Sequence, residues 1–150
     1  MKVGLGCDHC GYEFKTRLIN DLKKEGFTII DYGTYSSEPV DYPDYALKVC
    51  DAYNDGFIDF GIVLCATGIG VSIVCNKINN IRCALATTVE IARVSREHND
   101  SNILAIGSKY MDYDIVLEIV LVFLNESFSN EERHINRLEK VRLLQENDDE

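Results

Sequence analysis

The chain has 150 residues and a mass of 17.0 kDa, which suits one domain, and its formal net charge is −10. Apolar residues make up 46% and charged residues 27%, so a mostly disordered or fibrous chain is excluded. An acidic surface repels a polyanion, which argues against a nucleic-acid partner, and no apolar run reaches the roughly 20 residues that cross a bilayer.

The chain contains six cysteines and ends in an acidic segment. The N-terminal apolar stretch is too short for a secretory signal, so we expect a cytoplasmic protein whose cysteines are reduced thiols rather than disulfides. We expect residues 1–146 to form a single domain and residues 147–150 to form an acidic tail in solvent.

Strand-like apolar runs alternate with amphipathic stretches along the chain. The apolar runs predict strands at Lys2–Leu5, Thr28–Asp31, Phe60–Leu64, Cys83–Ala86 and Ile103–Ile106. The amphipathic stretches predict helices at Tyr12–Lys24, from Pro43 to about Tyr53, from Gly70 to about Lys77, from Val89 to about Glu97, and at Tyr113–Leu124 and Glu131–Glu146. This alternation predicts an α/β fold with a doubly wound parallel sheet of five strands and helices on both faces.

A glycine-rich turn follows the third predicted strand. It reads Cys65-Ala66-Thr67-Gly68-Ile69-Gly70. Such a turn between a strand and a helix lets backbone N–H groups converge on an anion, and a thiol placed there has its thiolate favoured. Cys65 is therefore a candidate base or nucleophile; the alternative is a buried cysteine before a tight turn. The spacing of a nucleotide P-loop is absent.

The first strand ends in Cys7-Asp8-His9-Cys10. Its Cys-x2-Cys spacing occurs in zinc and redox sites, but the other cysteines stand alone, so no second ligand pair is evident. Asp8 and His9 follow a strand end, where open α/β sheets bind ligands. They are candidate ligand contacts, or else ordinary loop residues.

The last predicted helix carries Arg133, His134 and Arg137. A spacing of four places both arginines on one face, where they could bind a phosphate through bidentate contacts. The alternative is a solvated face whose arginines pair with neighbouring glutamates.

These motifs together resemble those of type B ribose-5-phosphate isomerases, a family that also contains galactose-6-phosphate isomerases. The matching segments, in order from residue 1 to about 142, are Gly6–Gly11, Asp41–Ala46, Cys65–Gly70, Asn76-Lys77, Ser95–Asp100 and Arg133-His134 with Arg137. The resemblance implies a Rossmann-like fold, a homodimer with shared active sites, and cofactor-free and metal-free interconversion of ribose 5-phosphate and ribulose 5-phosphate.

The resemblance also implies roles for individual residues. Cys65 would be the base that moves a proton between C2 and C1, and Thr67 with the backbone amides of Ala66, Gly68, Ile69 and Gly70 would hold the enediolate oxygen. His98 would help to open the sugar ring, while Asp8, Tyr42 and Asn99 would contact sugar hydroxyls. The phosphate would lie against His9, Lys109, Arg133, His134 and Arg137.

Three positions depart from the usual pattern of the resembled family. Ala66 stands where that family usually has glycine, Cys10 where it usually has alanine, and Lys109 where it usually has arginine. Ala66 could narrow the approach to the ligand, and Lys109 keeps the charge without the planar fork. Two other functions stay open: the same chemistry on a six-carbon 6-phosphate, and a catalytically silent sugar-phosphate-binding or flavodoxin-like module.

Overall fold

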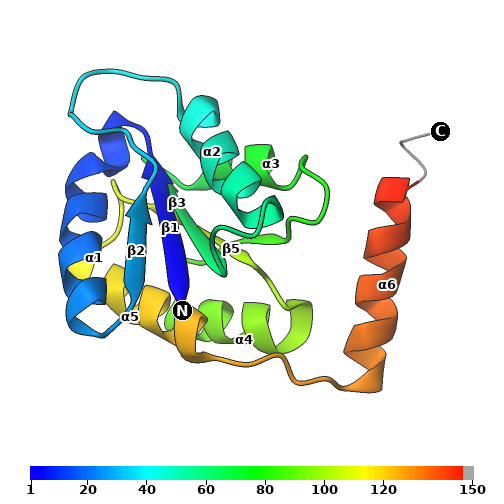
Figure 1. Ribbon diagram of the computed structural model, residues 1–150. Coiled ribbons are helices and arrows are strands. Elements are labelled where there is room, and N and C mark those ends of the chain that lie inside the picture. Colours follow the sequence, from blue (N-terminus) through cyan, green and yellow to red (C-terminus); the bar gives the residue numbers. More distant parts are fainter. Residues whose placement is uncertain (147–150) are drawn as a thin grey trace.

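A parallel sheet of five strands forms the centre of the computed structural model, which describes residues 1–146 (Figure 1). The strand order is β2-β1-β3-β5-β4. The strands are β1 (Lys2–Cys7), β2 (Thr28–Asp31), β3 (Phe60–Cys65), β4 (Cys83–Leu85) and β5 (Ile103–Gly107). Because all pairs are parallel and β1 and β3 are neighbours, the chain winds in opposite directions from this point. This is the Rossmann-like, doubly wound topology that the sequence predicts.

Helices cover both faces of the sheet. The chain forms α1 (Tyr12–Lys24), α2 (Tyr42–Asn54), α3 (Ile69–Cys75), α4 (Val89–Asn99), α5 (Tyr113–Asn125) and α6 (Glu132–Glu146), with a short 3-10 turn, η1, at His9–Gly11. Apolar side chains of α1, α4 and α5 pack on one face, and those of α2 and α3 pack on the other. The middle strands β3 and β5 are buried along almost their whole length, because each face meets a helical layer.

Local signals set the helix ends. Pro43 lies in the first turn of α2, where its missing N–H costs nothing, and the Thr88 hydroxyl accepts the Ile91 N–H at 3.1 Å to cap α4. α3 ends at Cys75, two residues before the predicted end, because the Asn76 side chain bonds both the N–H and the carbonyl of Cys83 instead. α4 runs to Asn99, two residues beyond the predicted end.

Helix α6 stands away from the sheet (Figure 1). It contacts the body mainly through α4, and His134 is its one buried residue between 132 and 145. Several of its apolar side chains face solvent, among them Ile135 at 46%, Val141 at 46% and Leu144 at 67% exposure. No helix within residues 1–146 is long and apolar enough to cross a membrane. The predicted acidic tail at 147–150 lies outside the described residues.

Candidate active site

Cys65 is the last residue of β3 and lies at the carboxyl edge of the sheet. Its side chain is 5% exposed, and its Sγ accepts the N–H of Gly68 at 3.1 Å. Gly68 is the N-cap of α3 and has φ +78°, and a Cβ there would lie 2.6 Å from Leu85 and 2.9 Å from the backbone of Gly107. The turn therefore requires glycine at 68, and it brings a backbone donor to the cysteine sulfur.

The loop after β5 is bonded to this turn. The N–H groups of Ser108 and Lys109 donate to the carbonyls of Cys65 at 2.9 Å and Ala66 at 3.0 Å. The Ser108 hydroxyl also lies 2.7 Å from the carbonyl of Cys10 and 3.1 Å from that of Cys65, so it joins the loops after β1, β3 and β5. Ser108 is not among the predicted site residues, because its contacts are with backbone carbonyls that sequence patterns do not report.

The segment after β1 contributes a buried carboxylate to the same edge. Asp8 is 6% exposed, and its Oδ1 accepts the N–H groups of Cys10 at 2.9 Å and Gly11 at 3.3 Å. His9 is half-buried, and its Nδ1 accepts the Val40 N–H at 3.2 Å, which leaves Nε2 as the nitrogen that can donate to a ligand.

Tyr42 reaches the glycine-rich turn from the start of α2. A Cβ at Gly70 would lie 2.6 Å from the Tyr42 ring carbon Cζ and 2.9 Å from its hydroxyl oxygen. The aromatic ring and the turn are thus in direct contact. Thr67 is exposed beside them, and its Oγ1 accepts the Ile69 N–H at 3.2 Å. The structure thus brings Tyr42 and the turn that follows Cys65 together.

Cys7 and Cys10 are free cysteines and form no disulfide with each other. Cys7 is 1% exposed in β1, and burial raises the pKa of its thiol to about 12. Cys10 is exposed, and the pKa of its thiol is raised by partial burial and by the charges of Asp8 and Cys65. Within residues 1–146, no three His, Cys, Asp or Glu side chains are grouped to hold a metal ion.

A second group of predicted site residues lies at the opposite edge. The Asn99 carbonyl accepts from Nε of Arg82 at 3.1 Å, and Arg82 directly precedes β4, so the end of α4 lies at the amino edge. Strands of six residues such as β3 separate the two edges by roughly 20 Å. Within one chain, His98 and Asn99 therefore lie far from Cys65. A helix that follows a parallel strand returns to the edge where the next strand begins.

The two histidines at this amino edge are stacked. The rings of His98 and His134 lie 4.4 Å apart and are inclined by 13°. His134 is 4% exposed, and its Nε2 has no hydrogen-bond partner within residues 1–146; that atom lies 4.0 Å from a carboxylate oxygen of Glu131. Burial lowers the pKa of His134, and the positive charges of Arg133 and Arg137 and the neighbouring His98 lower it further, while Glu131 acts in the opposite direction.

The arginines of α6 belong to this amino-edge group. Arg133 is exposed and its Nε donates to Glu131 at 2.9 Å, which is the glutamate pairing considered as the alternative to phosphate binding. Arg133 and Arg137 both act electrostatically on His134. Lys109, in contrast, lies at the carboxyl edge, with its ammonium 5.6 Å from the centre of the Tyr110 ring.

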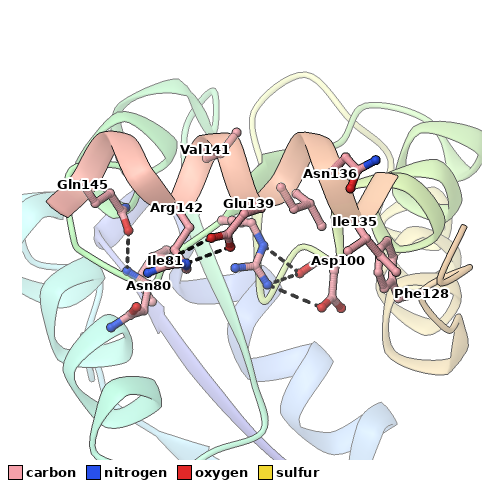
Figure 2. Close-up of a pocket in the computed structure, with 12 residues that line it drawn as sticks. Asn80, Ile81, Asp100, Phe128, Ile135, Asn136, Glu139, Val141, Arg142 and Gln145 are labelled. Carbon is pink, nitrogen blue, oxygen red and sulfur yellow. Dashed lines mark hydrogen bonds and ion pairs between the residues drawn. The ribbon is translucent and has the colours of Figure 1, made fainter. Parts of the chain in front are cut away.

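A cavity of about 470 Å³ lies between α6 and the body (Figure 2), and Cys65 does not line it. Its charged groups are paired: Arg82 bonds the Asp100 carbonyl at 2.8 Å, and Arg142 bonds Glu139 at 2.7 Å. The remaining lining combines the apolar residues Ile81, Phe128, Ile135, Leu138 and Val141 with the polar residues Asn80, Asn136 and Gln145. This cavity is a groove at the base of a projecting helix and holds none of the predicted site residues.

The sugar-isomerase family model described as "Ribose/Galactose Isomerase" matches residues 3–141. Ribose-5-phosphate isomerase B of Escherichia coli is 38% identical over 145 residues, which are 97% of each chain. The structure of ribose-5-phosphate isomerase B from Clostridium thermocellum superposes with a TM-score of 0.96 at 46% identity, covering 98% of this chain and 99% of that one. The galactose-6-phosphate isomerase subunit LacB of Clostridium acetobutylicum is 32% identical over 99% of this chain and 86% of its own length.

The thiol, the buried carboxylate and the glycine-rich turn lie together at the carboxyl edge of an open α/β sheet. Together with the family match, this arrangement places the protein in the class of sugar isomerases. The chain belongs to the ribose/galactose isomerase family, and it is an aldose–ketose isomerase. The family resemblance seen in the sequence is confirmed.

Proposed function

We propose that this enzyme interconverts ribose 5-phosphate and ribulose 5-phosphate, the isomerase step of the pentose phosphate pathway, with Cys65 as the base and with no metal or other cofactor. The observation that carries the proposal is the arrangement at the end of β3, where the Cys65 sulfur accepts the Gly68 N–H at 3.1 Å beside a turn rich in backbone donors. The relatives that are named as ribose-5-phosphate isomerases support this choice of substrate.

The chemistry follows from the weak acidity of a proton beside a carbonyl. The Cys65 thiolate takes the proton from C2 of the open-chain aldose, and the electron pair of that C–H bond forms the C1–C2 double bond of the enediolate. The resulting thiol returns a proton to C1, while the proton of the C2 hydroxyl passes to the C1 oxygen, so that C2 becomes the ketone carbonyl. Donors preorganised at the developing oxyanion lower this barrier, and Thr67 and the backbone N–H groups of residues 66–70 are suited to that task. A thiolate is an effective base when its pKa lies near the working pH.

The remaining contacts complete the proposed site. His98 assists ring opening, while Asp8, Tyr42 and Asn99 contact sugar hydroxyls. His9, Lys109, Arg133, His134 and Arg137 hold the phosphate. Of these residues, only the carboxyl-edge set lies near Cys65 in one chain, because His98, Asn99 and the residues of α6 lie at the amino edge.

The separation of these two sets supports a homodimer with shared active sites. In a two-fold dimer, the amino-edge set of one subunit can complete the carboxyl-edge set of its partner. The projecting α6, with half-exposed Ile135 and Val141, and the exposed Ile69 and Ile73 of α3 provide apolar surface for such an association. The groove between α6 and the body in Figure 2 provides further apolar surface for contact with the partner subunit.

A six-carbon sugar phosphate is the second candidate substrate, because the Clostridium acetobutylicum relative carries the name galactose-6-phosphate isomerase. The deciding experiment is an assay of the purified enzyme on ribose 5-phosphate, allose 6-phosphate and galactose 6-phosphate. We expect the highest kcat/KM on ribose 5-phosphate. A higher value on either 6-phosphate would replace the substrate assignment, and inactivity on all three would leave the silent binding module.

Lys109 offers a test of phosphate contact at the carboxyl edge. Its backbone N–H donates to the Ala66 carbonyl, whereas its exposed ammonium lies 5.6 Å from the centre of the Tyr110 ring. Loss of the charge in Lys109→Ala should raise KM roughly 10-fold with little change in kcat, while Lys109→Arg should keep or lower KM. Unchanged KM in both variants, measured by steady-state kinetics, would remove Lys109 from the site.

A further inference from the structure

Arg96 is a buried cation in α4 that no step of the proposed mechanism uses. Its side chain is 8% exposed. Nη1 donates to Asp100 Oδ1 at 2.9 Å and to the Ser101 carbonyl at 2.6 Å, and Nε donates to the Glu126 carbonyl at 3.3 Å. The guanidinium also lies 4.7 Å and 5.7 Å from the ring centres of Phe60 and Phe123. A buried charge with this many contacts is fixed in one orientation.

These contacts tie together two segments that are far apart in sequence. Asp100 and Ser101 directly follow the end of α4, and Asp100 adopts a left-handed φ of 44° that terminates the helix. Glu126 is the C-cap of α5, where the connection to α6 begins. A second bond, from the Ser129 N–H to the Glu97 carbonyl at 3.1 Å, holds the same connection against α4. Arg96 therefore sets where α6 starts relative to the end of α4.

The stacked histidines lie on these two segments. His98 is on the last turn of α4, and His134 is on the first turn of α6. The charged groups that act on the pair are Arg133 and Arg137 from α6, Glu131 from the connection and Glu90 from α4. Any change in the angle between the helices would separate the rings, expose Nε2 of His134 and move the neighbouring arginines.

We propose that Arg96 is a positioning residue: by clamping the end of α4 to the start of the α5–α6 connection, it holds His98, His134 and the α6 arginines as one preformed unit. Its catalytic consequence rests on the proposed function, in which this unit opens the sugar ring and binds the phosphate. A misplacement of about 1 Å in such a unit costs roughly 100-fold in rate.

The test compares Arg96→Met with Arg17→Met. Arg17 stacks on Tyr113 at 3.7 Å and does not touch the α5–α6 connection, so it controls for loss of an arginine stacked on a ring. The chain has three histidines, and their ring Cε1–H resonances can be titrated by proton NMR, with His134→Asn identifying the His134 signal. In Arg96→Met we expect the His134 pKa to rise toward its ordinary value, because the ring is no longer buried; in Arg17→Met it should stay lowered.

Activity provides the second readout. We expect kcat/KM on ribose 5-phosphate to fall roughly 100-fold in Arg96→Met and to be nearly unchanged in Arg17→Met. Arg96→Lys keeps the charge but lacks the planar guanidinium whose separate nitrogens bond Asp100, Ser101 and Glu126, so its kcat/KM should fall between the two; it serves if Arg96→Met does not fold. A wild-type His134 titration in folded Arg96 variants would overturn the positioning role. Absence of isomerase activity in the wild type would instead refute the proposed function. The NMR titration would still test whether Arg96 positions His134.

Discussion

Replacement of Cys65 by alanine is expected to lower isomerase kcat by roughly 10²- to 10⁴-fold, the range that a positioned general base supplies. The side chain is small and almost fully buried, and its sulfur accepts the Gly68 N–H at the start of α3. Alanine removes the proton acceptor but leaves the turn, whose shape depends on Gly68 and on the bonds from Ser108 and Lys109. Steady-state kinetics in both directions measures the loss.

Binding separates this interpretation from a folding defect. Cys65→Ala should retain ribose 5-phosphate affinity by calorimetry, since none of the groups assigned to the phosphate is changed. Cys10→Ala is the matched control: its thiol is exposed at the same edge, and its backbone carbonyl, which Ser108 uses, survives the substitution. We expect Cys10→Ala to retain near wild-type turnover. Substantial turnover by Cys65→Ala would refute the base assignment.

The fold could be predicted from sequence because each βα unit carries its own local signal. The apolar run at β3 is buried on both faces, and the helical spacing of Leu18 and Leu22 places both in the core beside α5. The predicted helix ends are less accurate where a hydrogen bond to the next element decides them. Asn76 ends α3 by bonding the backbone of Cys83, a contact that exists only after β4 has joined the sheet.

The carboxyl-edge part of the site could also be predicted, because the ends of parallel strands meet at one edge. That rule places Asp8, His9 and Cys65 together without further information. Tyr42 follows from the family resemblance alone, since the loop before α2 has no periodic pattern that would fix its path. Ser108 could not be singled out because its role depends on two backbone carbonyls, which sequence patterns do not report.

The position of His98 relative to Cys65 could not be predicted from one chain alone. A helix after a parallel strand must end at the amino edge, so the same rule that assembles Cys65 and Asp8 separates them from His98. The resemblance assigns all of these residues to one site. Both statements hold together only if a second subunit supplies the missing set, and that requirement can be tested directly.

We expect two inactive variants to restore activity when their subunits are mixed. Cys65→Ala damages the carboxyl-edge set and Arg137→Ala damages the amino-edge set. Unfolding and refolding an equimolar mixture should give about half mixed dimers on random pairing. In each mixed dimer, one site carries both lesions and the other carries neither. Roughly a quarter of all sites should therefore be intact, and the mixture should show about a quarter of the specific activity of wild-type enzyme refolded in the same way.

A second mixture supplies the matched control. Cys65→Ala paired with Asp8→Asn places both lesions in the carboxyl-edge set, and the asparagine oxygen can still cap η1. Every site in that mixed dimer keeps one lesion, so no recovery above the separate variants is expected. If Cys65 and Arg137 instead acted within one chain, the first mixture would stay as inactive as the second. That result, with mixed dimers verified by native mass spectrometry, would rule out the shared site. A single subunit would then have to bring together residues from two edges that lie roughly 20 Å apart.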